Sequence, residues 1–449
     1  MTFLATAAEV GLVRDAPLLD VVGRHLEVPL VTGGNRRFVH LDYAASAPAL
    51  QIVADAVDAF LPWYSSVHRG AGFTSTVSSE ALENARETVR LFVGARSDDA
   101  VVLTRNTTDS LNLLARALPP GTTVLTLDLE HHANLLPWRA HDHRHLTTPA
   151  STSELPDLFD AALRRLNGGT VLVAVTGASN VTGEVLPIAE LTAVAHRHGA
   201  RIVVDAAQLA PHRAVDIAAI DVDFVALSGH KLYAPYGSGV LIGRRDWLDA
   251  APPHLAGGGA VRSVTRTDVD WSPSPARHEA GTPNVVGAVA LAAACRALTE
   301  LGMGRVAAHD EALTGYLRDR LDEVPGIHAL SAFGPDSERV GIVALHSARH
   351  PASVVAAALS AEHGIATRDG AFCAHPFLRN LFGTTDQDSD LPNALRVSIG
   401  VGTTRADIDA VVDALTDIAA NGPRWTYAVV GGRLVPTPDD RPRPTFTTG

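Results

Sequence analysis

The stretch Phe224-Val225-Ala226-Leu227-Ser228-Gly229-His230-Lys231 runs from four apolar residues into a polar loop that ends in a lysine. An apolar run without alternation is typical of a strand buried on both faces of a parallel sheet. In open α/β sheets, ligands bind beyond the carboxyl ends of the strands. We therefore expect Lys231 at a ligand site. It is the only lysine in the chain, so the other 36 of the 37 basic residues are arginines.

Five similar runs surround this stretch, and segments long enough for crossover helices separate the earlier ones. They predict an α/β domain with a mostly parallel sheet over residues 36–285. The last three runs, counting 224–227, are closely spaced, so they could include an antiparallel strand. The five runs are Val101–Thr104, Thr123–Leu127, Val171–Val175, Ile202–Asp205 and Val240–Ile242.

The remaining segments predict a second domain and two extensions. A smaller α+β domain is expected over residues 286–420, beginning with an alanine-rich helix and ending with a helix capped by Thr403 or Thr404. Residues 1–35 are expected to pack on this small domain. Residues 421–449 predict a hairpin with Gly431-Gly432 as its turn, followed by a proline-rich polar tail.

Composition narrows the class of protein. The chain has 449 residues, of which 46% are hydrophobic, so it can build sizeable cores and is too apolar to be disordered. A net charge of −12 argues against a nucleic-acid partner. Cys295 and Cys373 are too few for a disulfide framework, which fits a reducing compartment. The N-terminus lacks a basic signal region and the longest apolar run, 285–295, is too short to span a bilayer. We expect a cytoplasmic protein without a membrane partner.

Asp205 is the residue that gives Lys231 a chemical context. It ends the run that precedes 224–227, and a carboxylate at the end of a buried strand is costly without a cationic partner. The protonated ring nitrogen of pyridoxal phosphate is such a partner, and a lysine amine forms a Schiff base with the cofactor's aldehyde. The alternatives are a surface loop for Lys231 and a helix N-cap role for Asp205.

Two further loops follow predicted strands at the same edge. Residues 105–110 precede a helix over 111–118, so their backbone amides and hydroxyls suit a phosphate, with Ser228 and His230 opposite. The alternative is that Thr108 or Ser110 only caps this helix. His131, in the loop 130–134, could stack on a flat ring or move protons, or it could be an ordinary hydrogen-bonded loop histidine.

Three alternating histidines in a predicted loop could indicate a metal site. Neither a carboxylate nor a cysteine completes a credible site with them, so no metal is expected. They are His141, His143 and His145.

Together these motifs resemble those of the class V, fold-type I enzymes that use pyridoxal phosphate, and within them the cysteine desulfurase and selenocysteine lyase branch. The resemblance extends from about Leu41 to about residue 418. It implies a large domain with a mostly parallel sheet and a smaller α+β C-terminal domain. The matching segments are 40–45, 67–70, Thr107-Thr108, 130–134, 179–183, 204–208, 228–231 and 279–284.

The resemblance implies a role for each matched residue. Lys231 would hold the cofactor and shuttle protons, Asp205 would pair with the ring nitrogen, and His131 would stack on the ring. Gln208 and Asn180 would bond the ring hydroxyl. The phosphate would be held by Thr107, Thr108, Ser228 and His230.

Two matched residues imply contributions beyond this set. Thr282 resembles the residue that reaches the phosphate of a neighbouring subunit, which implies a homodimer with shared active sites. His68 lies in a segment that the family brings near the substrate.

The second half of the implied chemistry depends on Cys373. Arg368, Gly370, Cys373 and Ala374 match the pattern around the family's nucleophilic cysteine, and a thiolate on a loop near basic groups can attack sulfur. The alternative is an inert buried cysteine, which suits Cys295 in its alanine-rich helix.

Arg396 resembles the arginine that grips the substrate carboxylate, a task that suits its planar fork. Asn180 and His68 would also contact the substrate.

The implied activity is removal of sulfur from L-cysteine, or of selenium from selenocysteine, leaving alanine and a persulfide on Cys373. A sulfur-acceptor protein would then be a second partner. Departures from the family pattern leave an alternative open, namely transamination, epimerisation or C–S lysis in a specialised pathway. Ala371 and Phe372 replace two histidines before the cysteine, His375 follows it, and 402–404 reads Gly-Thr-Thr where Tyr-Asn-Thr is common.

Overall fold

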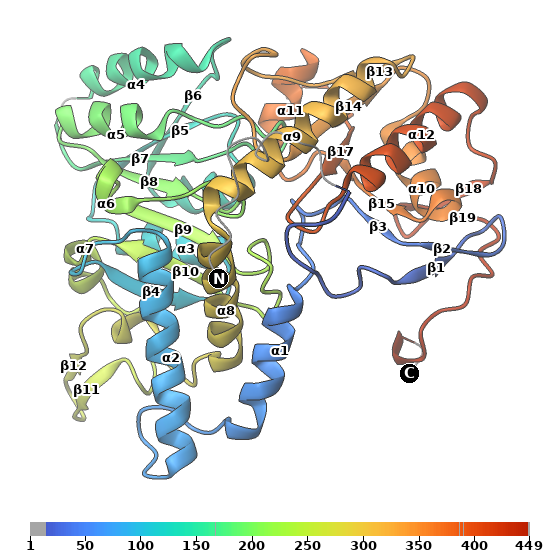
Figure 1. Cartoon of the computed structure of the whole chain (residues 1–449). Coiled ribbons are helices and arrows are strands. Elements are labelled where there is room, and N and C mark those ends of the chain that lie inside the picture. The colour runs from blue at the N-terminus through green and yellow to red at the C-terminus, as the bar shows by residue number, and fades with distance from the viewer. Residues whose placement is uncertain (1–14, 167, 386, 389, 448–449) are drawn as a thin grey trace.

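The computed structural model describes residues 15–447 except 167, 386 and 389. A large sheet with helices on both faces lies beside a smaller sheet with its own helices, and α9 (Met303–Asp322) leads from one to the other (Figure 1).

The large sheet has seven strands in the order β4-β10-β9-β8-β7-β5-β6. All neighbours are parallel except β10, which is antiparallel to both β4 and β9. One of the three closely spaced strands is therefore antiparallel, as the spacing allowed. The strands are β4 (Ala100–Thr104), β5 (Thr123–Leu127), β6 (Asp142–Leu146), β7 (Val171–Thr176), β8 (Arg201–Asp205), β9 (Phe224–Ser228) and β10 (Gly239–Gly243).

Burial on both faces explains the apolar runs. In β9, Val225 and Leu227 pack into one hydrophobic core, while Phe224 and Ala226 pack into the core on the opposite face. Alternate side chains of a strand point to opposite faces, so both sets must be apolar. The helices that supply these cores, with the short helices between them, are α2 (Phe73–Phe92), α3 (Thr107–Ala117), η3 (His132–Asn134), η4 (Pro137–Ala140), η5 (Thr152–Glu154), α4 (Leu155–Arg164), α5 (Ile188–Arg197), α6 (Ile217–Ile220) and α7 (Arg245–Ala250).

Strand β6 differs from the prediction of a loop for this segment. It is the edge strand, paired in parallel with β5 from Thr123 opposite Asp142 to Leu127 opposite Leu146. An edge strand exposes much of its surface, so it carries polar side chains and lacks the apolar pattern of the central strands. His143 and His145 share this strand, and their rings lie 4.1 Å apart. Among the described residues, no group of three or more His, Cys, Asp or Glu side chains could hold a metal ion.

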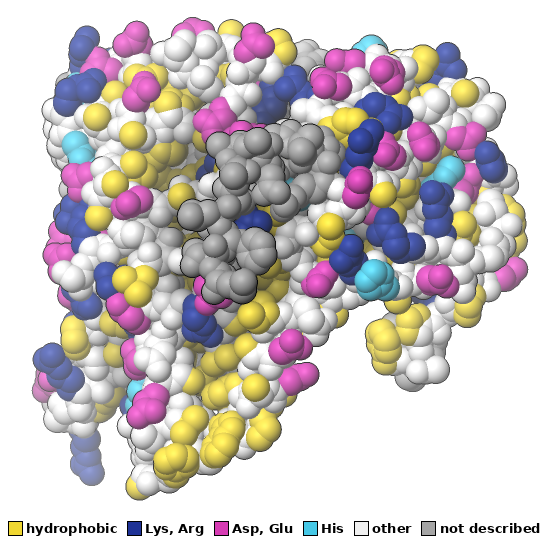
Figure 2. All heavy atoms as spheres, viewed as in Figure 1, with side chains coloured by type: hydrophobic (Ala, Val, Ile, Leu, Met, Phe, Trp, Pro, Cys, Tyr) yellow, Lys and Arg dark blue, Asp and Glu magenta, His cyan; other side chains and the backbone are white. Residues whose placement is uncertain are grey.

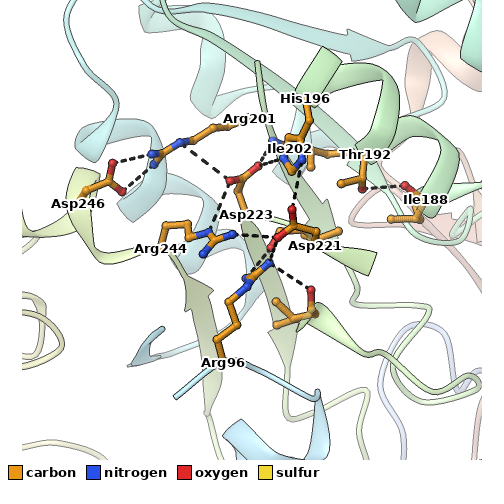
Figure 3. Close-up of polar contacts among 12 residues, drawn as sticks. Arg96, Ile188, Thr192, His196, Arg201, Ile202, Asp221, Asp223, Arg244 and Asp246 are labelled. Atoms are coloured by element: carbon orange, nitrogen blue, oxygen red, sulfur yellow. Dashed lines mark hydrogen bonds and ion pairs between the residues drawn. The ribbon is translucent and has the colours of Figure 1, made fainter. Parts of the chain in front are cut away.

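Charged residues fix the amino-terminal end of β9 (Figure 3). Asp223 accepts hydrogen bonds from His196 Nε2 at 2.9 Å and from the backbone N–H of Ile202 at 3.0 Å. Arg96 donates to Asp221 Oδ1 at 2.5 Å. These contacts tie the turn before β9 to α5, to β8 and to the chain before β4, so the strand that leads to Lys231 is anchored at its far end.

The alanine-rich helix α8 (Val285–Leu301) packs against α1 (Gln51–Phe60) and α2 of the large domain. Its small residues allow this close contact. The sequence predicts that this helix begins the small domain. Its packing on α1 and α2 instead supports a domain boundary after Leu301.

The small domain is built on the antiparallel sheet β13-β14-β17-β16. Its core contains residues of α9, α10 and α12. Thr404 begins α12 with a capping box that includes Asp407, which decides between the two predicted caps. The elements are β13 (Ile327–Ala329), β14 (Ile342–Ser347), α10 (Ala352–His363), β15 (Ile365–Ala366), β16 (Arg368–Gly370), α11 (His375–Phe382), β17 (Ala394–Ser398) and α12 (Arg405–Asn421).

The described part of the N-terminal segment lies against the small domain. The N–H of Leu18 donates to the carbonyl of Val401 at 2.8 Å, and the N–H of Val31 donates to the carbonyl of Ala361 in α10 at 3.0 Å. Just after this segment, strand β3 (Val39–His40) pairs with β15. Residues 1–14 lie outside the described residues. The remaining elements are β1 (Glu27–Pro29), β2 (Asn35–Arg37), η2 (Leu61–Trp63), β11 (Val261–Val264), β12 (Val269–Trp271), η6 (Ala276–His278), β18 (Tyr427–Val430), β19 (Arg433–Pro436) and η7 (Thr445–Thr447).

The C-terminal extension is anchored through Glu362 of α10. Its carboxylate accepts from the N–H groups of Arg424 and Trp425 and from Tyr427 Oη at 2.6 Å. Strands β18 and β19 pair antiparallel, and Gly431 and Gly432 adopt φ values of 57° and 77° in the turn between them.

Within the described residues, no single helix has the length and apolar character needed to cross a membrane. The pair α8 and α9 meets those criteria only jointly and is bent by 82°.

Candidate active site

A cavity of about 690 Å³ lies beyond the carboxyl ends of the central strands, where the small domain faces the large one. The large sheet contributes the loops after β4, β5, β7, β8 and β9, while the small domain contributes residues 368–375 and Arg396. Most of the residues predicted from the sequence line this cavity: Thr107, Thr108, His131, Asn180, Asp205, Gln208, Ser228, His230, Lys231, Cys373 and Arg396.

Asp205 and Lys231 both line the cavity, and their charges interact. Asp205 is buried, and burial raises the pKa of its carboxyl group. Its Oδ1 accepts the N–H of Ala207 at 2.9 Å, and within the described part of the chain no arginine or lysine nitrogen lies within 4 Å of this carboxylate. A buried carboxylate that lacks a cation suits a ligand that brings one.

Burial lowers the pKa of Lys231 to about 8, against the opposing effects of Asp205 and Cys373, while Arg396 lowers it further. The amine therefore exists partly in its neutral form near neutral pH. A neutral amine is a nucleophile and a base, which a surface lysine at the same pH is not. Lys231 lines the cavity and is only partly exposed, so it does not lie in an exposed surface loop.

The loop after β4 joins the loop after β9 through two hydroxyl side chains. Thr107 donates its N–H to Ser228 Oγ at 2.8 Å, and the two hydroxyl oxygens lie 2.9 Å apart. Asn106 caps α3, since its side chain accepts the N–H of Asp109 at 2.9 Å. Neither Thr108 nor Ser110 is the cap, so the alternative that they only cap the helix is wrong. The helix N-terminus offers an anion site at the cavity.

Close backbone packing holds this loop in place. A Cβ atom on Gly239 of β10 would lie 2.4 Å from Asn106 Cα, a distance that side chains do not tolerate. Glycine is therefore required for β10 to approach the start of α3. The anion site is thereby held against the sheet.

His131 and His230 are neutral. Burial lowers the pKa of His131 to about 3 and that of His230 to about 4, and Lys231 lowers both further. His131 Nδ1 accepts the N–H of Ala133 at 3.0 Å, which places the ring proton on Nε2. His131 thus presents a flat, uncharged ring to the cavity while also making the hydrogen bond of an ordinary loop histidine.

The two amide side chains are each committed to a backbone carbonyl. Gln208 Nε2 donates to the carbonyl of Ala44 at 2.8 Å. Asn180 Nδ2 donates to the carbonyl of Phe372 at 2.7 Å, which ties the loop after β7 to the turn that carries Cys373. Their carbonyl oxygens are the groups left for a ligand.

Arg396 is buried and only partly satisfied. It donates from Nη1 to the carbonyl of Asn180 at 2.8 Å and from Nη2 to Asp42 Oδ1 at 3.2 Å, and its guanidinium lies 4.9 Å from the centre of the Phe372 ring. Its Nε has no hydrogen-bond partner among the described residues. A buried, partly free guanidinium suits a carboxylate ligand.

The two cysteines differ in the way the sequence suggested. Cys295 is fully buried in α8, and burial raises the pKa of its thiol. Cys373 is exposed at the cavity. The alternative of an inert buried cysteine therefore holds for Cys295 and not for Cys373.

His68 and Thr282 lie away from this cavity. His68 is exposed, and its Nε2 lies 3.1 Å from Glu83 Oε1. Thr282 is exposed in the loop between η6 and α8. A single chain does not bring either residue to the site, so their roles remain predictions.

Sequence reasoning missed three residues that shape the site. Asp42 and Phe372 hold Arg396, although both stand in segments that the motif comparison covers. Glu130 is completely buried, which raises the pKa of its carboxyl group to about 8. Its carboxyl group accepts hydrogen bonds from Asn134 Nδ2 at 2.8 Å and from the N–H of Thr176 at 2.9 Å. These bonds attach the loop that carries His131 to β7.

Known proteins share this fold and sequence. Residues 39–411 match the class-V aminotransferase family. A cysteine desulfurase of Salmonella typhimurium is 35% identical over 392 residues, covering 84% of this chain and 93% of the relative. The crystal structure of the cysteine desulfurase CsdA from Escherichia coli is similar with a TM-score of 0.74 and 33% identity, covering 85% of this chain and 94% of that one. A cysteine desulfurase from Thermococcus onnurineus NA1 gives a TM-score of 0.76 at 29% identity, covering 85% and 95% of the two chains.

The chain belongs to the class-V aminotransferase family, whose members are enzymes with the α/β fold of type I that depend on pyridoxal phosphate. Within that family it belongs with the cysteine desulfurases, because the identity extends over most of both chains. The unpaired Asp205, the partly neutral Lys231 and the helix N-terminus beside Ser228 form a donor set that fits this cofactor.

Proposed function

We propose that this protein is a cysteine desulfurase, which removes sulfur from L-cysteine, or selenium from selenocysteine, and leaves alanine with a persulfide on Cys373. One observation carries the proposal: an exposed thiol, a partly free buried guanidinium and a lysine with a lowered pKa line the same cavity. A desulfurase needs these three groups to attack sulfur, to hold the carboxylate and to move the α-proton.

The cofactor would be held by residues of the large domain. Lys231 would bind its aldehyde carbon, Asp205 its ring nitrogen, and Thr107, Thr108, Ser228 and His230 its phosphate. His131 would lie on its ring, and Gln208 and Asn180 would contact the ring hydroxyl. Pyridoxal phosphate supplies an electron sink for the bonds at the α-carbon of the amino acid.

The protein's own groups then perform the remaining work. Arg396 binds the substrate carboxylate, and Lys231 takes the proton from the α-carbon as a base. The Cys373 thiolate attacks the substrate sulfur, so that a sulfur–sulfur bond forms while the carbon–sulfur bond breaks. The electron pair of the broken bond stays with the carbon skeleton, which takes up protons and leaves as alanine.

The chain is proposed to act as a homodimer with shared active sites. Exposed apolar side chains gather at the foot of α1 and α2 (Figure 2). Leu61, Trp63 and Tyr64 are about half exposed, and Phe73 is 74% exposed. An apolar patch of this kind marks a protein interface. The exposed loop with Thr282 and the exposed His68 are free to serve the partner's site, and analytical ultracentrifugation should give twice the mass of the chain.

A persulfide on exposed Cys373 is open to a thiol from outside, which supports a sulfur-acceptor protein as a second partner. Two free cysteines and a mechanism that needs a reduced thiol support a cytoplasmic location.

The competing function keeps the cofactor and makes Cys373 a spectator, as in transamination, epimerisation or C–S lysis. Substituting Cys373→Ser separates the two. Under the proposal, the variant binds pyridoxal phosphate normally but forms neither alanine nor sulfide from L-cysteine. Full turnover in the variant would remove the nucleophile role and favour the competing function. A panel of amino acids assayed for keto-acid products identifies which competing reaction occurs.

A further inference from the structure

The turn that carries Cys373 has an unusual backbone. Phe372 and Cys373 adopt φ values of 52° and 55°, two consecutive left-handed residues that are not glycine. The N–H of Ala374 donates to the carbonyl of Ala371 at 2.9 Å and closes the turn. Residues with a Cβ atom avoid this conformation, so contacts from elsewhere must hold the turn.

His132, in η3 of the large domain, makes two of these contacts. Its N–H donates to the carbonyl of Cys373 at 2.7 Å. Its Nε2 receives the N–H of His375 at 3.4 Å. Because a backbone N–H donates, Nε2 carries no proton, so the ring is neutral with its proton on Nδ1. Burial and the neighbouring His375 lower the pKa of His132 and favour this neutral form.

The second contact also serves helix α11. This helix begins at His375, and the residue before it, Ala374, has no side chain that could cap it. His132 therefore accepts the first N–H of a small-domain helix from a loop of the large domain. A third contact, from Asn180 Nδ2 to the carbonyl of Phe372 at 2.7 Å, also crosses between the domains. The reactive turn is thus held from the large domain, which also carries Lys231.

We propose that His132 is a positioning residue for Cys373: its backbone N–H binds the carbonyl of Cys373, its ring Nε2 accepts the N–H of His375, and the ring contact keeps the thiol turned into the cavity. The proposal rests on the desulfurase function and adds a residue to the step in which Cys373 attacks the substrate sulfur. Without the His132 ring, the left-handed turn loses a partner on the C-terminal side of Cys373 and relaxes toward ordinary backbone angles. The thiol then leaves the position from which it attacks the substrate sulfur.

Two controls accompany His132→Ala. His132→Gln keeps an acceptor of similar reach and should restore most of the lost rate. His375→Ala removes the neighbouring imidazole but keeps the backbone N–H that donates to His132, so its loss of rate should be clearly smaller than that of His132→Ala. Because Lys231 and Arg396 are untouched, the visible absorbance of bound pyridoxal phosphate and the KM for L-cysteine should stay unchanged in all three.

In His132→Ala, we expect kcat for alanine formation to fall about 100-fold, the size of effect that a misplaced reacting group causes. Alkylation of the protein by iodoacetamide should become faster, because the turn is released. Alkylation reports on Cys373 alone, since Cys295 is buried. General unfolding would also lower kcat and speed alkylation, but it would make Cys295 reactive as well, so faster modification of Cys373 alone distinguishes a released turn.

Three results would overturn the inference: an unchanged kcat in His132→Ala, an equal loss in His375→Ala, or a loss accompanied by altered cofactor absorbance. Failure of the proposed function appears differently, as full turnover in Cys373→Ser. The two experiments therefore test the positioning role and the desulfurase function independently.

Discussion

The strands of the seven-stranded sheet begin and end beside the same kinds of charged residue, but the pairing of those residues differs. We call the end where the strands begin the amino edge and the end where they finish the carboxyl edge. At the amino edge, Asp221 and Asp223 are both paired, with Arg96, His196 and Arg244 around them (Figure 3). These contacts join α5, β8, the turn before β9 and the residue after β10. Every member has a partner of opposite charge, so the cluster stabilises the fold.

At the carboxyl edge, Asp205, Lys231 and Arg396 share one cavity, but no cation pairs with Asp205 in the described structure and Arg396 Nε is unpartnered. Burial without full pairing shifts the pKa of each of these three groups. The comparison shows that a charged cluster left incomplete marks a site for ligand chemistry, while a complete one serves stability.

The largest effect is expected at the incomplete edge. Lys231→Ala removes the base and the amine that binds the cofactor, so desulfuration should fall by at least about 10⁴-fold. The visible absorbance of the covalently bound cofactor should vanish as well. Because Lys231 is the only lysine, that absorbance cannot pass to another lysine. Spectra of the purified variant with added pyridoxal phosphate measure this, and a retained lysine-bound spectrum would be incompatible with the assignment.

Asp205→Asn removes the buried carboxylate and keeps its shape. We expect turnover to fall about 100- to 1000-fold, because the cofactor ring loses the charge that keeps it protonated. Thermal stability of the cofactor-free protein should not fall, since Asp205 has no cationic partner within the described residues. A clear loss of stability would show that Asp205 belongs with the paired charges instead.

The pH dependence of cofactor uptake tests the state of Lys231 directly. In the cofactor-free protein, only the neutral amine adds to the aldehyde, so the uptake rate should rise with pH and level off above the pKa of about 8. Asp205 raises this pKa, so the midpoint in Asp205→Asn should move to lower pH. Stopped-flow absorbance gives both midpoints. A parent midpoint near 10.5, the ordinary pKa of a lysine amine, would contradict the burial of the amine.

At the complete edge, Asp223→Asn should cost stability and spare the chemistry. Asp223 is buried and bonds both His196 and the N–H of Ile202, so the free energy of unfolding should fall by about 2 kcal/mol. Urea denaturation of the parent and the variant measures this. The KM for L-cysteine should stay unchanged, and a marked rise in KM would link the two edges.

Asp221→Asn is the matched exposed change and should have the smallest effect. The Asp221 side chain is 56% exposed, so water screens its pairs with Arg96 and Arg244, and the loss should be about 0.5 kcal/mol. Asparagine also tolerates its φ of 54°. A loss as large as that of Asp223→Asn would mean that the turn before β9 depends on both carboxylates equally.

Much of the fold was predictable because the central strands are buried on both faces, which leaves apolar runs such as 224–227 in the sequence. Strand β6 was missed because an edge strand has no such run. The cofactor pocket was predictable because Asp205 and Lys231 follow adjacent parallel strands, whose carboxyl ends meet at one edge. Asp42 and Phe372 beside Arg396 were not, because their side-chain contacts join segments more than 20 residues apart in the chain, which no local pattern in the sequence indicates.

One measurement tests the central claim most directly. The holoenzyme is mixed with one equivalent of L-cysteine per active site and no other thiol, because excess cysteine could itself take the sulfur from Cys373, and its mass and peptide map are determined alongside the alanine released. The account predicts one alanine per active site and the gain of one sulfur atom on the peptide that contains Cys373. Release of alanine or a keto acid without sulfur on Cys373 would contradict it.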